Sequence, residues 1–383
     1  MTLRIALFGE LGIGNLGNDM SCRQVRDRLA QVVPGARLTA LVRDAGRAEQ
    51  VLGLPAVSFA TSHGSSALAR VAAKLVDAAG MLRVVGRFDL VVVPGTGLLE
   101  EATARLPGGD LVWLALLSLA CRVRRVPLVW VGLGGSRYAH RVPALVAAWA
   151  ARGARRRSYR DTMTRDSLGR AGLDVCRDTV MHDVVLGADP APTVPAAAGG
   201  HVVVSVINVL AGRGRARYAA TMAQVVDRLA AAGDQVLMLV VDDADVAATD
   251  EVLALLDGPA PPTVHPTDLE GLVGALADAD VVVASRYHAL VGTLLAGRCP
   301  VAVAHADKDV AVMAQAGLDD YLLSIDDVSA DDVLRLVASS RADAARVRQA
   351  GDQVCRAARA SVGTEMAALG AVLERRRWQR PPG

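Results

Sequence analysis

The sequence predicts an α/β protein with two Rossmann-like domains that face a cleft, and two observations support this prediction. Apolar runs of strand length alternate with segments of helical periodicity along most of the 383 residues. Such alternation is typical of a parallel, doubly wound sheet. The pattern stops once, at the Pro-, Ala- and Gly-rich residues 188–200, and then restarts. We therefore expect one sheet on each side of a linker.

The first half of the chain contains the elements of one such sheet. Strands are predicted at residues 4–8, 37–42, 90–93, 128–131 and 157–161, and helices at residues 20–32, 65–82, 111–122 and 143–153. A glycine-rich turn at residues 9–19 joins the first strand to the first helix, with Asn18 or Asp19 as the N-cap of that helix. Two further glycine turns, at residues 94–97 and 132–136, follow buried strands.

The second half repeats the alternation after the linker. Strands are predicted at residues 202–206, 236–241, 281–284 and 301–304, and helices at residues 216–232, 268–277 and 289–296. Residues 331–373 are mostly helical and lead into a basic tail at residues 375–377. We expect an N-terminal domain over residues 1–190, a C-terminal domain over residues 200–350, and a C-terminal helix and tail over residues 351–383.

Composition limits the classes of partner and site. The chain is 52% hydrophobic with a net charge of +2, which fits a large core and no nucleic-acid partner. The five cysteines are scattered and form no CxxC pair, which predicts free thiols in a reducing compartment. The sequence contains no HxH or HExxH spacing, so we do not expect a metal site. No apolar segment reaches the ~20 residues of a bilayer span. We expect a cytoplasmic protein, with peripheral contact at the inner membrane face through the basic tail as an option.

A polar corner at residues 285–288 concentrates the candidate chemistry. The apolar strand 281–284 ends abruptly in Ser285, Arg286, Tyr287 and His288, at the edge where open α/β sheets bind ligands. A cation beside an imidazole lowers the pKa of the imidazole, which keeps part of it neutral and able to accept or relay a proton. A histidine after a strand can also be purely structural.

Other basic residues follow strands at the same kind of edge. Lys308 comes after the strand 301–304, in a chain that uses arginine for almost every cation. Arg160 ends a predicted strand, and its guanidinium can fork onto a carboxylate or a phosphate. The neighbouring arginines at residues 155–157 are expected to form a solvated basic face. His140 and His305 are second-rank candidates near the expected cleft.

The glycine turns are candidates for binding a second substrate. Asn15, Asn18 and Asp19 carry groups that suit sugar hydroxyls, whereas a purely structural turn needs only one of them as a cap. Further candidates on the neighbouring turns are Gly95, Thr96, Gly97 and Ser136. The first turn departs from a GxGxxG spacing and lacks the acidic residue that would hold a ribose. Tight turns without a ligand are therefore the alternative interpretation.

These corners, in this order, resemble the polysaccharide pyruvyl transferase family. The matching motifs are Gly14-Asn15-Leu16-Gly17-Asn18-Asp19, Gly95-Thr96-Gly97, Arg160-Asp161, Ser285-Arg286-Tyr287-His288-Ala289-Leu290, Gly297-x-x-Pro300 and Lys308. The resemblance covers about residues 4 to 320 and implies a glycosyltransferase-B-like fold. It implies a transferase of polysaccharide biosynthesis that moves the enolpyruvyl group of phosphoenolpyruvate onto a sugar as a pyruvate ketal and releases phosphate. Two places depart from the family pattern: Pro94-Gly95-Thr96-Gly97 stands where a glycine triplet is commoner, and His305 stands where an aromatic is often seen.

The resemblance also implies roles for single residues. Arg160 and Arg286 would grip the phosphate and carboxylate of phosphoenolpyruvate, with Ser285, Tyr287 and Lys308 beside them, and His288 would be the catalytic acid or base. The acceptor, a sugar, lipid-linked sugar or glycan, would bind the N-terminal domain at the glycine-turn candidates. Phosphoenolpyruvate would be a co-substrate, and no cofactor or metal is implied.

Two other functions compete with this interpretation. A nucleotide-sugar-dependent glycosyltransferase of the same fold would also place cations on phosphates, but it needs a carboxylate for the ribose, and Asp307 is the best available. A non-catalytic binding protein could keep the fold without the chemistry. The combination of Arg286, His288 and Lys308 argues against a degenerate enzyme.

Overall fold

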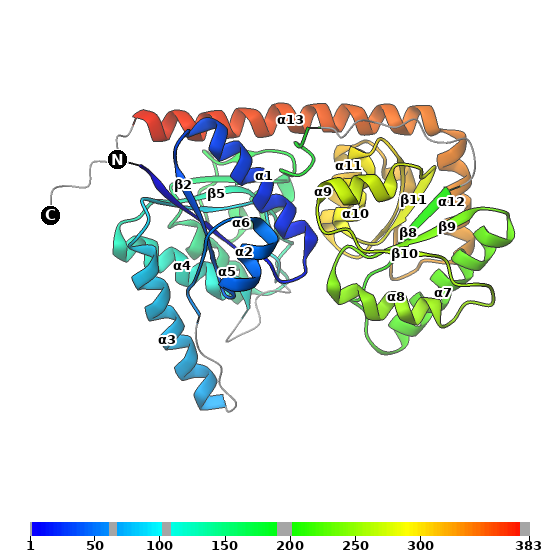
Figure 1. Ribbon diagram of the computed structural model, residues 1–383, viewed down its shortest axis with the longest axis horizontal. Coiled ribbons are helices and arrows are strands. Elements are labelled where there is room, and N and C mark those ends of the chain that lie inside the picture. The colour runs from blue at the N-terminus through cyan, green and yellow to red at the C-terminus, as the bar shows by residue number, and fades with distance from the viewer. Residues whose placement is uncertain (1, 61–66, 102–108, 190–200, 376–383) are drawn as a thin grey trace. The chain divides into compact units, whose positions relative to one another are not determined.

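The computed structural model describes residues 2–60, 67–101, 109–189 and 201–375, without the side chains of residues 67–75 and 374–375 (Figure 1). It divides into two compact units. Unit 1 consists of Met1–Ile13, Asn18–Gly187 and Ala360–Gly383, and unit 2 of Gly14–Gly17 and Ala188–Arg359. Residues 190–200 of the expected linker, the start of the helix predicted at 65–82, and Arg376 and Arg377 of the tail lie outside the described residues.

Unit 1 is built on a parallel sheet. Its strands are β1 (Arg4–Phe8), β2 (Arg37–Val42), β3 (Ala56–Ser58), β4 (Leu90–Val93), β5 (Leu128–Leu133), β6 (Arg156–Tyr159) and β7 (Thr179–Val180). Among the described residues these seven strands follow the order β3-β2-β1-β4-β5-β6-β7. The order reverses between β1 and β4, so the carboxyl ends of these two strands form a topological switch point.

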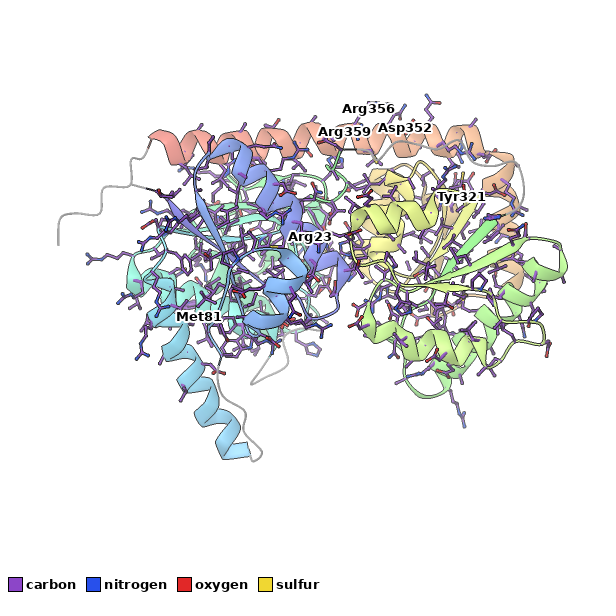
Figure 2. All side chains as sticks on the ribbon, viewed as in Figure 1. Arg23, Met81, Tyr321, Asp352, Arg356 and Arg359 are labelled. Atoms are coloured by element: carbon purple, nitrogen blue, oxygen red, sulfur yellow. The ribbon has the colours of Figure 1, made fainter. Side chains whose placement is uncertain are left out.

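Helices enclose this sheet and bury its core. They are α1 (Leu16–Val32), α2 (Ala45–Leu52), α3 (Ala67–Val85), α4 (Asp110–Arg124), α5 (Arg141–Ala151), α6 (Thr162–Arg170) and the last part of α13 (Ala344–Arg375). Phe59 joins the aromatic core, with its ring centroid 5.6 Å from that of Phe8 and 5.2 Å from that of Trp113. Met81 of α3 is fully buried in the same cluster (Figure 2). β4 and β5 are buried along their whole length, which explains their uninterrupted apolar sequences.

Unit 2 repeats the architecture. Its strands are β8 (His201–Ser205), β9 (Gln235–Leu239), β10 (Thr263–Val264), β11 (Val281–Ala284), β12 (Cys299–Ala304) and β13 (Leu322–Ser324). Its helices are α7 (Gly212–Ala231), α8 (Val246–Leu253), α9 (Leu269–Leu276), α10 (Tyr287–Leu295), α11 (Asp307–Gln315), α12 (Ala330–Ala342) and the first part of α13, with the short 3-10 turns η2 (Asp243–Asp245) and η3 (Asp319–Tyr321). The described strands follow the parallel order β10-β9-β8-β11-β12-β13, with a switch point between β8 and β11. The prediction of two parallel, Rossmann-like sheets is confirmed.

Three local expectations were wrong. Helix α1 begins at Leu16, so neither Asn18 nor Asp19 is its N-cap; the Asp19 carboxylate instead accepts a hydrogen bond from the Gly12 N–H at 2.7 Å. Gly132 lies within β5 and not in the turn after it. The pairing of β5 with β6 shifts register around this residue, and its φ of 65° is a left-handed conformation that glycine adopts without strain. The strand predicted at 157–161 ends at Tyr159.

None of the described helices is both long and apolar enough to cross a membrane.

Candidate functional site

The polar corner lies at the switch point of unit 2. The four buried residues of β11 pair with β8 on one side and β12 on the other, and the Ser285 N–H extends this pairing by donating to the Ser205 carbonyl at 2.9 Å. Arg286 keeps an extended backbone, with φ −107° and ψ 134°, and α10 begins at Tyr287. Tyr287 and His288 therefore occupy the first turn of a helix, not the loop that the sequence indicated.

The side chains of this corner divide into buried and accessible ones. Ser285 is 1% exposed and accepts a 2.7 Å hydrogen bond from the hydroxyl of Tyr218, which is itself buried. Tyr287 is 5% exposed, and its ring packs edge-on against the His288 ring, with centroids 5.0 Å apart. Arg286 and His288 are only partly buried. Of the four residues predicted at the corner, these two are the ones placed to meet a ligand.

Arg286 forms a bidentate ion pair with Asp245. Its Nε donates to one carboxylate oxygen of Asp245 and its Nη2 donates to the other at 2.7 Å. Asp245 is fully buried at the end of η2 and also accepts a 2.8 Å hydrogen bond from the Asn208 N–H. Burial acts to lower the pKa of Arg286, but the hydrogen bonds and charge of Asp245 outweigh it and raise this pKa. The guanidinium is therefore permanently charged and fixed in orientation.

A second carboxylate, Asp242, connects Arg286 to the glycine-rich turn. Asp242 lies 3.5 Å from the Arg286 Nη2 and accepts a 2.8 Å hydrogen bond from the Asn15 amide. Asn15 and Asp242 also form an antiparallel bridge, next to which the Asp243 N–H donates to the Gly14 carbonyl at 3.0 Å. Gly14–Gly17 thus belongs to unit 2, and the structure joins Asn15, a predicted acceptor-binding residue, to Arg286, a predicted donor-binding residue.

The last glycine of this segment lies against the candidate catalytic imidazole. A Cβ built on Gly17 would lie 1.9 Å from His288 Nδ1 and 2.1 Å from His288 Cε1. Gly17 has an ordinary helical backbone and does not need to be glycine for its φ angle. Its lack of a side chain is explained by the imidazole, which fills the space that a Cβ would take.

The corner after β12 completes the carboxyl edge of the unit 2 sheet. His305 follows this strand, and its Nδ1 lies 2.8 Å from a carboxylate oxygen of Asp309. The same carboxylate accepts hydrogen bonds of 3.1 Å from the backbone N–H groups of His305 and Ala306, so Asp309 caps α11. Lys308, also partly buried, is in the first turn of this helix. The cap uses the backbone N–H of His305, whereas its Nδ1 makes no hydrogen bond within the described residues.

In unit 1, Arg160 is buried among carboxylates. It is 3% exposed, with Glu100, Asp183 and Asp161 at 3.6, 3.7 and 3.8 Å from its guanidinium nitrogens. The plane of the guanidinium occupies the place where a Cβ of residue 134 would be, which explains Gly134. Three carboxylates around one cation make an electronegative surrounding, so an anion would have to compete with them for Arg160.

The remaining acceptor candidates in unit 1 mostly hold the turns together. Asn18 donates to the Glu10 carbonyl at 3.1 Å, and the Ser136 hydroxyl accepts from the Glu101 N–H at 2.9 Å. Thr96 is 1% exposed and its carbonyl accepts from the Gly134 N–H at 3.0 Å. Gly95 and Gly97 accommodate the side chains of Val184 and Glu100, respectively. His140 is exposed, and its Nδ1 lies 2.7 Å from a carboxylate oxygen of Glu101.

One charged cluster of unit 1 was missed by sequence reasoning. Glu10 follows β1, Arg43 follows β2, and Asp110 begins α4; the Arg43 guanidinium contacts Glu10 and lies 3.6 Å from Asp110. Burial, then the charge and hydrogen bond of Glu10, raise the pKa of Asp110 to about 7. Two carboxyl groups that share a hydrogen bond at the switch point can hold or move a proton. The positions of Glu10 and Arg43, shortly after β1 and β2, were the available signal.

Asp242 and Asp245 were also missed. They belong to an Asp-Asp-Ala-Asp run that follows β9, and the topology brings the end of β9 beside β8 and β11. Within the described residues, no group of three or more His, Cys, Asp or Glu side chains is arranged to hold a metal ion.

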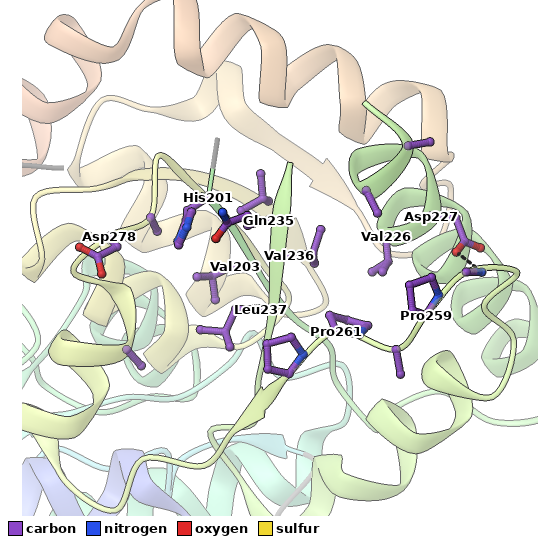
Figure 3. Close-up of a pocket in the computed structure, with 18 of the residues that line it drawn as sticks. His201, Val203, Val226, Asp227, Gln235, Val236, Leu237, Pro259, Pro261 and Asp278 are labelled. Atoms are coloured by element: carbon purple, nitrogen blue, oxygen red, sulfur yellow. Dashed lines mark hydrogen bonds between the residues drawn. The ribbon is translucent and has the colours of Figure 1, made fainter. Parts of the chain in front are cut away.

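An apolar cavity of about 1020 Å³ in unit 2 (Figure 3) has neither Arg286 nor His288, and neither Asp242 nor Asp245, in its lining. His201 and Gln235, which line it, begin β8 and β9, so the cavity is at the amino edge of the sheet. Val203, Val236 and Pro261 supply apolar walls (Figure 3). Ligand sites of open α/β sheets lie at the opposite, carboxyl edge, where Arg286 and His288 are found.

Comparisons with solved structures identify the fold. S. aureus MnaA, solved with UDP, has a TM-score of 0.62 and 9% identity over 98% of this chain and 97% of that one. The UDP-GlcNAc 2-epimerase from Neisseria meningitidis, bound to UDP-GlcNAc, has a TM-score of 0.61 and 9% identity over 98% and 100% of the chains. Anabaena HepE, in complex with UDP and glucose, has a TM-score of 0.60 and 12% identity over 98% and 100%. At these identities the similarity establishes only the fold, which is glycosyltransferase-B-like.

Comparisons with curated proteins and with protein-family models test which family the chain belongs to, which the fold alone does not establish. No curated protein matches the chain. The family model described as polysaccharide pyruvyl transferase matches residues 15–307, a span that contains Asn15, Arg160, Arg286 and His288. The chain belongs to the polysaccharide pyruvyl transferase family.

Proposed function

We propose that the protein transfers the enolpyruvyl group of phosphoenolpyruvate to a sugar-containing acceptor, as a pyruvate ketal, with release of phosphate. The observation that carries this proposal is the family match over the switch point of unit 2, where a fixed guanidinium and a partly accessible imidazole follow β11. The reaction needs cations for an anionic donor and one group that transfers protons. Arg286 and His288 are groups of these two types.

The donor would bind at the outer edge of Arg286. Asp245 holds the Nε and Nη2 atoms, so a carboxylate or phosphate of phosphoenolpyruvate would take the edge that includes Nη1. The N-termini of α10 and α11 and the ammonium of Lys308 add positive potential at the carboxyl ends of β11 and β12. These groups would offset the charges of Asp242 and Asp245, which Arg286 alone does not neutralise.

His288 would supply the proton transfer. Protonation of the methylene carbon of phosphoenolpyruvate makes its central carbon electrophilic, and one acceptor hydroxyl attacks that carbon and loses its proton. The bond to the phosphate oxygen then breaks, phosphate leaves, and a second hydroxyl attacks the same carbon to close the ketal. The two hydroxyl protons are thus accounted for by the new methyl group and the released phosphate. Asn15, joined to Arg286 through Asp242, would help to position the acceptor.

His288→Ala tests this assignment. Release of phosphate from phosphoenolpyruvate, measured with a panel of sugar acceptors, should fall by ~100-fold or more, because general acid–base groups contribute rate factors of this size. Binding of phosphoenolpyruvate should persist. His265→Ala, which removes an exposed histidine of the same unit, is the matched control and should behave like the unaltered protein. Near-normal turnover by His288→Ala would refute the role of His288.

A further inference from the structure

Unit 1 exposes a continuous apolar surface on two helices, which we name the α4–α5 face. It consists of Leu119 and Val123 on α4, and Val142, Leu145 and Trp149 on α5. These are five of the eleven large apolar side chains that are exposed among the described residues, so they are concentrated, not scattered. Their spacings, i to i+4 on α4 and i, i+3, i+7 on α5, place each set on one side of its helix.

The two helices present these side chains side by side. The guanidinium carbon of Arg122, on α4, lies 4.9 Å from the centre of the Trp149 ring on α5. Arg122 also donates to the Trp149 carbonyl at 3.3 Å. Arg122 is adjacent to Val123 on α4, and Trp149 lies one helical turn from Leu145 on α5. The contact between Arg122 and Trp149 therefore joins the apolar residues of the two helices into one surface, with an arginine at its centre.

The charged residues of the segment that carries this face have a single sign. Residues 111–160 contain ten arginines and no Asp or Glu. Seven of these arginines are exposed: Arg122, Arg124, Arg125, Arg137, Arg141, Arg152 and Arg155. Beside the face, Leu145 also lines a pocket of about 570 Å³ together with His140, Arg141, Arg170 and Ser167. The Ser167 hydroxyl is buried and has no hydrogen-bond partner among the described residues. Glu101 pairs with His140 at one side of this pocket, so Arg141, Arg170 and the Ser167 hydroxyl are the groups that it offers to an anion.

We propose that the α4–α5 face binds the surface of a membrane that contains anionic phospholipids. Exposed Leu, Val and Trp side chains would enter the boundary between head groups and acyl chains, while the surrounding arginines meet lipid phosphates. The pocket beside Leu145 is suited to one head group. A second copy of the chain fits this face less well, because a two-fold contact brings the same patch, and hence the same arginines, together. This inference does not depend on the reaction that the protein catalyses.

Flotation of the full-length protein with vesicles tests the proposal. Vesicles of phosphatidylcholine with added phosphatidylglycerol should carry the protein upward, vesicles of phosphatidylcholine alone should carry much less, and salt should weaken the binding. Val123→Glu/Val142→Glu should abolish it. Val209→Glu/Leu255→Glu places the same charges on apolar residues of unit 2 with comparable exposure and should leave it unchanged. Arg124→Gln should weaken binding about fivefold, the loss typical of one basic residue near an anionic surface.

Other outcomes would overturn the proposal. Binding that survives in Val123→Glu/Val142→Glu, but is lost in Arg376→Gln/Arg377→Gln, would assign the membrane contact to the basic tail. A concentration-dependent dimer that dissociates in Val123→Glu/Val142→Glu, without any vesicle binding by the unaltered protein, would assign the face to self-association. Circular dichroism of all three double variants verifies that each is folded, so that a loss of flotation reports a change in the surface.

Discussion

Gly17→Ala tests whether catalysis depends on the position of the His288 imidazole. The added Cβ would lie 1.9 Å from His288 Nδ1. Ordinary contact between nonbonded atoms requires ~3.5 Å, so the ring must move by roughly 1.5 Å or rotate away. A misplacement of ~1 Å in a catalytic group can lower a rate by ~100-fold. Because Gly17 has a helical backbone, alanine introduces no φ strain, so any loss in the free energy of unfolding comes from displacing the imidazole.

The assay measures kcat from phosphate release and the affinity for phosphoenolpyruvate from thermal shifts. We expect kcat to fall by ~100-fold and the affinity to be kept. Gly274→Ala is the matched control, because it adds the same methyl group to a helix where no atom lies within 4 Å of the new Cβ. The double variant Gly17→Ala/His288→Ala should be no slower than His288→Ala alone, since both changes act on one group. If Gly17→Ala kept the kcat of Gly274→Ala, the proposed dependence on His288 would be wrong.

Two further predictions concern the charged groups at the switch points. Asp245→Asn should lower the free energy of unfolding, measured with urea, by ~3 kcal/mol or more, because it leaves the Arg286 charge without its buried partner. The control Asp331→Asn breaks an exposed ion pair with Arg228 and should lower the free energy of unfolding by less than ~1 kcal/mol. Equal losses in the two variants would contradict the argument from burial. Asp110 has a pKa of about 7 against an ordinary 3.8, so the folded state binds a proton that the unfolded chain has lost between these values, and stability should fall as pH rises through this range. Asp110→Asn should lack this pH dependence, and an unchanged slope would contradict the assignment.

The sheets were largely predictable because their central strands are buried on both faces. β1, β2, β4 and β11 have the bounds that their apolar runs predict. The strands that the sequence missed, β3, β7, β10 and β13, have only two or three residues each, too few for a recognisable pattern. Helices α2 and α11 were also missed, although α9 and α10, which have the same lengths, were predicted.

Candidate site residues could be proposed from the sequence, but their charged partners could not. Arg286 and His288 were identified because they follow a buried strand directly. The partner of Arg286, Asp245, is 41 positions earlier in the sequence, and only the strand order brings the two together. Asp307, the carboxylate that the sequence offered near the corner, lies in the first turn of α11.

The arginine run at residues 155–157 shows the same difficulty. It was expected to be a solvated basic face, and for two of the three residues this was wrong. Arg156 forms a bidentate pair with Glu365 at 2.6 Å, and Arg157 pairs with Asp178 at 2.7 Å. Both partners are distant in the sequence, so composition alone could not distinguish buried ion pairs from solvated charges.

The central claim is that the chain binds phosphoenolpyruvate at Arg286, and a thermal-shift titration tests it most directly. Phosphoenolpyruvate should stabilise the unaltered protein by ~2.7 kcal/mol at a hundred times its Kd, and UDP should not. The shift should vanish in Arg286→Ala and weaken in Lys308→Ala, a change that leaves the pair of Arg286 with Asp245 intact. Stabilisation by UDP alone would contradict the account and favour a nucleotide-sugar enzyme, and a phosphoenolpyruvate shift that both variants keep would place the donor elsewhere.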